Sequence, residues 1–333
     1  MKSPADSFLS RRTLLRSTSL VTLAAALPGS VLKAGEDDFL PIIDCHQHLW
    51  DLEKQDLPWL EKGTSPLRRN YVMADYLQAI AGTGIRHAIY MEVDVAAAEK
   101  IAEGEMLTEI CKAGKSPTVA AVIGGIPDDP SFEKYVKHWA GNEYIKGMRI
   151  VLGADKQNAQ TRCLSEPFVR GIRLLGENGL RFDLCMSPKQ LGDGARLVSS
   201  CPNTQFIVDH CGNADPNWWN NPTLPTEGEQ WKRDMDKLAK LPNTLCKISG
   251  IIARVQKEWS AADLAPAINY CLDTFGPRRV VFGSDWPVCL KGASLADWVR
   301  ALREIISQRP LEEQRLLLSA NAIREYALKL DGP

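Results

Sequence analysis

The feature of this sequence that most restricts its fold is a regular alternation, from about residue 40 to the end, of short apolar runs with longer amphipathic stretches. The short runs are rich in β-branched residues, which predicts strands, and the longer stretches repeat their apolar residues at helical spacing. Such alternation favours a parallel sheet with helices outside it. Because eight units fit into one chain of 333 residues, we predict an α/β fold made of a single (β/α)8 barrel of the TIM type, with extended loops after strands 1 and 6.

The predicted elements follow one another without a low-complexity linker or a heptad repeat. The predicted strands are Pro41–Trp50, His87–Val93, Thr118–Ile126, Ile145–Leu152, Leu180–Met186, Gln205–Cys211, Thr244–Gly250 and Arg279–Ser284. The predicted helices are Met73–Gly82, Ala97–Ala113, Ser131–Trp139, Pro167–Asn178, Asp234–Leu241, Ala262–Phe275 and Leu295–Ile305.

Two connections are too long to be simple turns: Asp51–Tyr71 after the first strand and Gly212–Lys232 after the sixth. Long loops at the carboxyl ends of barrel strands commonly carry binding residues. Both loops contain tryptophan, and the second also contains asparagine. Tryptophan beside asparagine suits a polyhydroxylated ligand, because the ring offers an apolar face and the amide offers hydrogen bonds. Equally, the tryptophans could cover the barrel without binding a ligand.

Residues 1–34 differ from the rest of the chain and are predicted to be a twin-arginine export signal, which leaves residues 35–333 as the barrel. Arg11 and Arg12 precede the apolar stretch Ser17–Leu27, which is too short to span a bilayer comfortably. Cleavage after Ala34 would release a mature chain without a membrane span into the periplasm or another exported location. The alternative is an amphipathic N-terminal helix of a cytosolic protein.

The nine cysteines are scattered and form no CxxC pair, and several, such as Cys45, Cys185 and Cys246, lie inside apolar strand-like runs. We therefore expect buried free thiols. This pattern suits a protein that folds in the reducing cytosol before it is exported. The formal net charge of −1 and the lack of a basic stripe in the sequence argue against a nucleic-acid partner.

Histidines and one aspartate at the ends of three predicted strands form the strongest candidate site. His46 and His48 lie two positions apart on the first strand, so we expect them to project from the same face. His210 ends the sixth strand and Asp285 ends the eighth, which neighbours the first in a closed barrel. Adjacent imidazoles can bind one metal ion or hold an anionic oxygen. Taken singly, Asp285 could be a helix cap and His210 a core histidine, but their convergence favours a functional site.

Four motifs carry a resemblance to a known family: D-x-H-x-H-x-W, V-D-H-C-G, C-K-I-S-G and F-G-S-D-W-P-V-C. They resemble the amidohydrolase superfamily, and within it the amidohydrolase-2 branch of lactone hydrolases that includes L-fuconolactonase and pyrone-dicarboxylate lactonase. The resemblance extends from about residue 40 to residue 330. It implies that His46, His48, His210 and Asp285 bind a metal or an oxyanion, with Asp285 and His210 in catalytic roles.

The chain departs from the superfamily members that hold two metals. Those members place a carboxylated lysine at the end of the fourth strand and a histidine at the end of the fifth. Here Lys146 lies at the start of the predicted fourth strand, and the fifth, Leu180–Met186, contains no histidine. We therefore predict at most one divalent metal ion, with His46 and His48 among its ligands and zinc the first choice for such ligands. Metal-free catalysis stays open as the alternative.

Further side chains are predicted to contact the substrate. Arg149 and Lys247 lie within strands, where a cation is costly unless it is paired or faces the barrel mouth. They could bind a substrate carboxylate or an oxyanion, or they could be internal ion-pair partners of Glu92 or Asp183. The complete predicted substrate-binding set is Arg149, Lys247, Trp50, Arg69 and Trp286.

These residues suggest hydrolysis of a small-molecule lactone, most simply a sugar-derived aldono-lactone. Asp285 would deprotonate a water molecule and later return the proton to the leaving alkoxide, while the histidines, or a metal that they hold, polarise the carbonyl. The same superfamily barrel also supports metal-dependent nonoxidative decarboxylation, which is the alternative enzyme. A third alternative is a catalytically inactive, exported sugar-binding barrel.

The export prediction can be tested by replacing both Arg11 and Arg12 with lysine. The variant should stay in the cytoplasm, because the arginine pair is the signature of the twin-arginine route. Fractionation of expressing cells measures where the protein accumulates. Unchanged export would show that the twin-arginine assignment is wrong.

Overall fold

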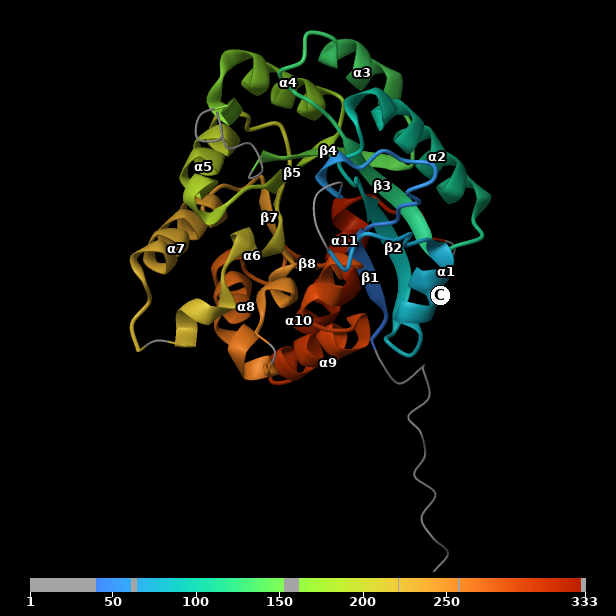
Figure 1. Cartoon of the computed structure of the whole chain (residues 1–333). Helices are drawn as coiled ribbons and strands as arrows, with labels where there is room; N and C mark the ends of the chain where they lie inside the picture. The colour runs from blue at the N-terminus through green and yellow to red at the C-terminus, as the bar shows by residue number, and fades with distance from the viewer. Residues whose placement is uncertain (1–39, 61–64, 153–161, 221, 257, 331–333) are drawn as a thin grey trace, which may run out of the picture. The chain divides into compact units, whose positions relative to one another are not determined.

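The computed structural model describes residues 40–60, 65–152, 162–220, 222–256 and 258–330, and Figure 1 shows its strands surrounded by helices. Eight parallel strands pair in the order β1 to β8. They are β1 (Ile42–Gln47), β2 (Ile85–Met91), β3 (Thr118–Gly124), β4 (Ile145–Val151), β5 (Arg181–Cys185), β6 (Phe206–Val208), β7 (Thr244–Ile248) and β8 (Val280–Phe282). A parallel bridge next to the carboxyl ends of β1 and β8 brings the two outer strands together. The predicted (β/α)8 barrel is confirmed.

Helices follow the strands along the chain, and most of them cover the outside of the sheet. They are α1 (Met73–Ile80), α2 (Lys100–Ala113), α3 (Phe132–Trp139), α4 (Glu166–Glu177), α5 (Leu191–Ser200), α6 (His210–Asn213), α7 (Thr226–Ala239), α8 (Ala261–Phe275), α9 (Leu295–Ile306), α10 (Leu311–Arg315) and α11 (Asn321–Glu325). The apolar pattern does not predict α5, because Gly192 and Gly194 interrupt it. Gly194 has a packing reason: a Cβ there would lie 2.7 Å from the sulfur of Met186.

The connection after β6 is shorter than predicted. Helix α7 begins at Thr226, inside the predicted loop Gly212–Lys232, and the remainder holds part of α6 and the 3₁₀ turn η7 (Pro216–Asn220). The first residues of α7 are polar, so the sequence has no apolar residues at helical spacing there that would predict a helix before Trp231. After β1, the described part of Asp51–Tyr71 contains the 3₁₀ turn η2 (Pro58–Leu60).

Backbone hydrogen bonds close the barrel between β8 and β1. The amide of Asp285 donates to the carbonyl of His46 over 2.9 Å, and the amide of His48 donates to the carbonyl of Trp286 over 2.8 Å. These bonds join the carboxyl end of β1 to the segment that follows β8. The closure therefore sets the separation between the histidines of β1 and the aspartate of β8.

A buried carboxylate supports this closure from the side of the first strand. Asp44 accepts hydrogen bonds from the amide of Ser284 at 2.7 Å and from its hydroxyl at 2.5 Å. It also accepts one from the hydroxyl of Tyr76 on α1 at 2.8 Å. The three bonds tie β1, β8 and α1 together, which explains the aspartate that opens the D-x-H-x-H motif.

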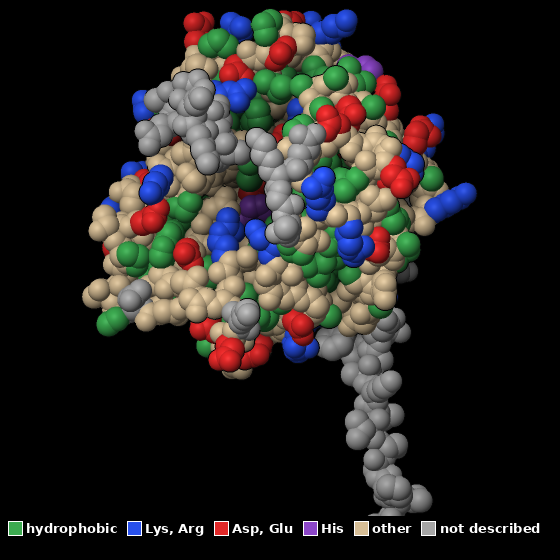
Figure 2. All heavy atoms as spheres, viewed as in Figure 1, with side chains coloured by type: hydrophobic (Ala, Val, Ile, Leu, Met, Phe, Trp, Pro, Cys, Tyr) green, Lys and Arg blue, Asp and Glu red, His purple; other side chains and the backbone are tan. Residues whose placement is uncertain are grey.

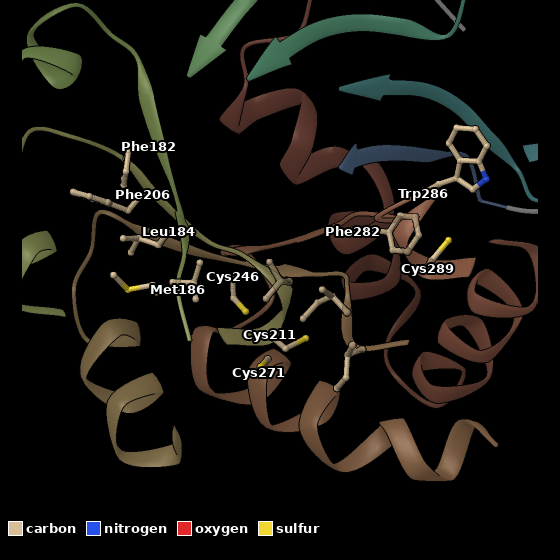
Figure 3. Close-up of a cluster of buried hydrophobic side chains, with 14 of the residues drawn as sticks. Phe182, Leu184, Met186, Phe206, Cys211, Cys246, Cys271, Phe282, Trp286 and Cys289 are labelled. Carbon is tan, nitrogen blue, oxygen red and sulfur yellow. The ribbon is translucent and has the colours of Figure 1, made fainter. Parts of the chain in front are cut away.

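Side chains pack on both faces of the curved sheet, because successive residues of a strand point to opposite sides. The interior cluster includes Ile43, Ile89, Val122, Ile207, Leu245, Val281 and Tyr326. The outer layer, part of which Figure 3 shows, includes Phe182, Leu184, Phe206, Cys246 and Phe282. At the amino ends of the strands, Lys146 donates to the carbonyl of Ala327. The C-terminal segment thus fills the end of the barrel opposite the candidate site.

All nine cysteines are buried and free, which confirms the prediction of unpaired thiols. Figure 3 labels Cys211, Cys246, Cys271 and Cys289, which belong to the outer layer. Within the described residues, no helix combines the length and apolarity needed to cross a membrane. The predicted export signal and the domain boundary at residue 34 lie outside the described residues and stay predictions.

Candidate active site

The two histidines of the first strand lie together beside an irregularity in the strand register. The register of β1 against β2 changes between Asp44 and Gln47, so that three steps along β1 match two steps along β2. The ring centroids of His46 and His48 are 4.8 Å apart. The predicted convergence is therefore confirmed, although the strand register is irregular here and His48 lies just beyond the end of β1.

Strained backbone positions bring the other two predicted residues to the same place. His210 has a φ of 57° and Asp285 a φ of 58°, both in the left-handed region that is rare for residues other than glycine. The ring of His210 lies 4.6 Å from that of His46. Asp285 Oδ1 lies 3.3 Å from His48 Nε2 and 3.6 Å from His46 Nε2. All four predicted residues therefore meet at the carboxyl ends of β1, β6 and β8.

The electrostatics of this cluster set the charge of its carboxylate. Burial raises the pKa of Asp285, but His210, His48 and His46 outweigh that effect, so its pKa lies well below the usual range. Burial, the larger effect, lowers the pKa of His210 to about 4. At neutral pH, Asp285 is therefore ionised and His210 is neutral.

The contact between His48 and Asp285 requires a shared proton or a cation. His48 Nδ1 lies 2.9 Å from the carbonyl oxygen of Met91. Because a carbonyl only accepts, Nδ1 must carry a hydrogen, and a neutral His48 then turns an unprotonated Nε2 towards the carboxylate of Asp285. Two acceptors this close repel each other unless a proton or a metal ion lies between them. His48, which the sequence suggested as a metal ligand, is not in the compact group formed by His46, His210 and Asp285, so a proton shared with Asp285 is the simpler account of this contact.

His46 lies between two cations and a carboxylate. Arg149 Nη1 lies 3.2 Å from its Nε2, and Lys247 Nζ lies 3.3 Å from its Nδ1. Asp209 Oδ1 lies 3.6 Å from the same Nδ1. Burial and then the charge of Lys247 lower the pKa of His46 well below its ordinary value. His46 is therefore a neutral imidazole.

Both strand cations, Lys247 and Arg149, are ion-paired. Lys247 is fully buried, with its Nζ 2.5 Å from Asp183 Oδ2 and 3.0 Å from Asp209 Oδ1. Arg149 donates through Nε to Glu92 Oε1 at 2.7 Å and through Nη2 to the backbone carbonyl of the same residue at 2.7 Å. The sequence suggested Glu92 and Asp183 as ion-pair partners of these cations, but it did not suggest Asp209. Asp209 directly follows the apolar run Phe206–Val208, and a carboxylate at that position could have indicated a buried partner for a cation.

Two glycines make room for two of the imidazoles. A Cβ added at Gly250 would lie 2.4 Å from Nδ1 of His210, and one added at Gly283 would lie 2.6 Å from Cβ of His46. His210 Nδ1 also forms a hydrogen bond of 2.9 Å with the hydroxyl of Ser249. These contacts explain the S-G of C-K-I-S-G and the glycine of F-G-S-D.

A cavity of about 580 Å³ opens above the cluster. Its volume lies within the roughly 300–1,000 Å³ typical of small-molecule sites. Figure 2 shows lysine and arginine side chains beside a hollow in which a histidine is visible. The wall is formed by His48, Trp50, Trp59, Val93, Asp94, Arg149, Val151, Cys185, Met186, Ser187, Pro188, His210, Asn213, Ala253, Arg254, Asp285, Val288 and Lys291.

Among the predicted substrate-binding residues, Trp50 and Arg149 line this cavity, whereas Lys247, Arg69 and Trp286 do not. Trp286 packs against the ring of Tyr71 at 5.4 Å, and the guanidinium of Arg69 lies 3.9 Å from the same ring. Lys247 lies beneath His46. The structure thus places these three residues where they support the site without touching its cavity.

The donor set fits one divalent metal ion. One ligand atom each of His46, His210 and Asp285 lie within 4.8 Å of one another. Nitrogen and carboxylate oxygen donors in this combination suit zinc. A second group among the described residues, Cys185, Asp209 and His210, is equally compact. Burial raises the pKa of its Cys185 thiol to about 12, which disfavours the thiolate that binds a metal, so the first group is the better candidate.

The Amidohydrolase family model matches residues 43–328, and the chain therefore belongs to this family. The match covers the whole barrel from β1 to the segment after α11, including the four site residues.

Similar proteins include enzymes named for lactone hydrolysis. The chain is 30% identical over 298 residues to an L-fucono-1,5-lactonase of Burkholderia multivorans, covering 86% of this chain and 96% of the relative. It is 24% identical over 338 residues to an L-rhamnono-gamma-lactonase of Scheffersomyces stipitis, covering 86% of this chain and 98% of the relative.

Solved structures show the same fold. A crystal structure of an amidohydrolase from Burkholderia multivorans with bound zinc has a TM-score of 0.76 and 26% identity, with 87% of this chain and all of that chain covered. The 5-carboxyvanillate decarboxylase of Sphingomonas paucimobilis has a TM-score of 0.58 and 15% identity, with 87% of this chain and 100% of that chain covered, which shows a shared fold alone.

Replacing Gly250 with alanine should lower activity by about 10²-fold, because the new methyl group must displace His210, and misplacement of about 1 Å can cost that much. Gly114, at the end of α2, is a matched control. It also has a positive φ, but nothing lies within 4 Å of its added Cβ. Both variants should lose about 1–2 kcal/mol of stability from backbone strain. Equal turnover in the two variants would contradict the positioning role of Gly250.

Proposed function

We propose that this protein is a lactonase that opens a sugar-derived lactone with a water molecule activated by Asp285. The observation that carries the proposal is the buried, ionised carboxylate of Asp285 among imidazoles at the base of a cavity of about 580 Å³. The family and the two relatives named as lactonases support a hydrolase that acts on cyclic esters.

Asp285 has the position and charge to accept a proton from water. Its low pKa makes it a weak base, so the attacking water must be made more acidic by positive charge nearby. Arg149 lines the same cavity and carries that charge, and its orientation is set by two hydrogen bonds to Glu92. The same guanidinium can stabilise the negative charge that develops on the carbonyl oxygen.

Ring opening then needs a proton on the leaving alkoxide. Asp285 holds the proton taken from water and can return it to this oxygen, which completes the hydrolysis without a further acid. His48 Nε2, 3.3 Å from Asp285 Oδ1, is placed to share that proton. Because His48 Nδ1 is held by the carbonyl of Met91, the ring cannot turn away during the transfer.

We also propose that the site holds one divalent ion, with zinc the first candidate. A divalent ion held by His46, His210 and Asp285 would lower the pKa of bound water and polarise the lactone carbonyl. The carboxyl end of β4 carries Ile150 and Val151, and that of β5 carries Cys185, so the lysine and the histidine that a second ion would need are not there, which supports a single site.

Decarboxylation of an aromatic acid is the less favoured function. An aromatic carboxylate would call for a bidentate arginine clamp. Arg149 already uses its Nε and Nη2 for Glu92, and Arg69 lies outside the cavity wall. Neither guanidinium therefore presents a free fork to the cavity, and the other arginine of the wall, Arg254, is exposed on the loop after β7.

We propose in addition that the enzyme works outside the cytoplasm. The paired Arg11 and Arg12 before an apolar stretch support this location. Nine buried, unpaired thiols are consistent with folding in a reducing compartment before export.

Elemental analysis tests the metal proposal. The purified protein should hold no more than one equivalent of zinc per chain, and His210→Ala should hold less. His138→Ala is the matched control, since His138 lies on α3 away from the site. Two equivalents of zinc per chain would show that the single-ion proposal is wrong.

Asp285→Asn tests the proposed base. It should lower kcat by about 10²- to 10⁴-fold, the usual contribution of general base catalysis, with little change in KM. Asp94→Asn, in the same cavity wall, is the control and should change kcat several-fold at most. Hydrolysis of aldono-lactones is followed with a pH indicator.

A different result is expected if Asp285 is only a helix cap. Asp285→Ala would then lose about 1 kcal/mol of stability while turnover stayed intact. Carbon dioxide release from a benzoate-type acid, with no lactone opened, would favour decarboxylation instead.

A further inference from the structure

The charges on the cavity wall do not cancel. Asp285 faces His48, and Arg149 is paired with Glu92. Asp94 lies 3.7 Å from Lys100, through its Oδ1 and the lysine Nζ. Arg149 and Asp94 therefore have partners of opposite charge, whereas Asp285 lies among imidazoles.

Two further cations line the same cavity, Arg254 and Lys291. Among the described residues, neither of them has a carboxylate partner within ion-pair distance. Both side chains are exposed to solvent. The described wall therefore carries two uncompensated positive charges, and they come from the loops after β7 and β8.

Arg254 is held in a defined orientation. It ends the 3₁₀ turn η8 (Ile251–Arg254), its Nη1 donates to the carbonyl of Gly250 at 3.2 Å, and its Nη2 donates to Oδ1 of Asn213. Asn213 is itself anchored, because its Nδ2 donates to the carbonyl of Met186 at 2.7 Å. Neutral partners thus fix the guanidinium and leave its charge unpaired.

Lys291 is brought to the same side by close packing. It ends the 3₁₀ turn η9 (Val288–Lys291), which packs against η8. Gly292 makes this approach possible, because an added Cβ would lie 1.8 Å from the carbonyl oxygen of Ile252. The two turns that carry the cations therefore form one wall of the cavity.

We propose that the substrate lactone carries a second, anionic group, a carboxylate, which Arg254 and Lys291 bind at the cavity mouth while the lactone carbonyl lies near Asp285. This inference rests on the proposed lactonase function. Guanidinium and ammonium groups bind carboxylates through charge-assisted hydrogen bonds, about twice as strong as neutral ones. The substrate class is then the lactone of a sugar diacid rather than of a neutral aldonic acid.

The chemistry at the reacting end is unchanged by this group. Water adds to the acyl carbon, the ring C–O bond breaks, and the alkoxide receives the proton from Asp285. The product is an open-chain dicarboxylate. The remote carboxylate takes no part in bond making, so Arg254 and Lys291 determine specificity and are not catalytic residues.

A matched pair of five-membered lactones tests the proposal. D-glucaro-1,4-lactone and D-glucono-1,4-lactone differ only at carbon 6, which is a carboxylate in the first and an alcohol in the second. We expect kcat/KM to be about 10- to 100-fold higher for the acidic lactone, as one or two charge-assisted contacts would produce. Raising the salt concentration should shrink this ratio, because exposed charges are screened.

Variants locate the effect. The double variant Arg254→Gln/Lys291→Met should bring the ratio of the two kcat/KM values close to one, mainly through the KM for the acidic lactone. Lys137→Met is the matched control, because Lys137 lies on α3 paired with Glu133, and its ratio should equal that of the unmodified protein. The salt dependence of the unmodified protein gives the same answer if the double variant fails to fold.

A binding measurement separates this inference from the lactonase proposal. D-glucarate should bind the unmodified protein in calorimetry and bind the double variant at least tenfold more weakly. If no lactone is opened but glucarate binding depends on the two cations, the lactonase proposal fails and the anion site stands. Equal or better turnover of the neutral lactone would overturn the anion site and leave the lactonase intact. Preference for 6-phosphoglucono-1,5-lactone over the glucaro-lactone would overturn the carboxylate assignment.

Discussion

The hydrogen bonds between β8 and β1 are the interaction on which both the barrel and its site depend. The amide of Asp285 donates to the carbonyl of His46, and the amide of His48 donates to that of Trp286. Three of these four residues also supply the imidazoles and the carboxylate of the site. The same hydrogen bonds therefore close the sheet and bring the reacting groups of the site together. Asp44 strengthens this closure through two hydrogen bonds from Ser284.

A buried group of charges beneath the imidazoles gives the site its electrostatic character. Lys247 contacts both Asp183 and Asp209, and Arg149 connects the group to His46. Removing one member of a buried ion pair commonly costs about 3–5 kcal/mol, because it leaves an uncompensated charge. The positive charge of Lys247 helps to keep His46 neutral, and a neutral imidazole is the form that can bind a cation or accept a hydrogen bond.

The sequence predicted the barrel and the meeting of His46, His48, His210 and Asp285, because apolar periodicity and chain order determine both. It could not reveal the irregular register of β1 or the left-handed backbone at His210 and Asp285, since these depend on pairing with neighbouring strands. Asp209 was missed because the sequence does not show which cations a buried carboxylate will contact. Trp286 was misplaced for a similar reason, because an aromatic residue beside a site residue can point into a cavity or into the core.

The two glycines behind the imidazoles have a consequence for engineering. Because an added Cβ at Gly250 or Gly283 would collide with His210 or His46, these positions tolerate no diversity in a mutant library that aims at a new substrate. The turn that ends at Arg254 and the turn that ends at Lys291 carry no such restriction from the imidazoles. Directed evolution of this scaffold should therefore randomise these two turns and leave Gly250 and Gly283 unchanged. Selectivity can then change while the reacting groups keep their positions.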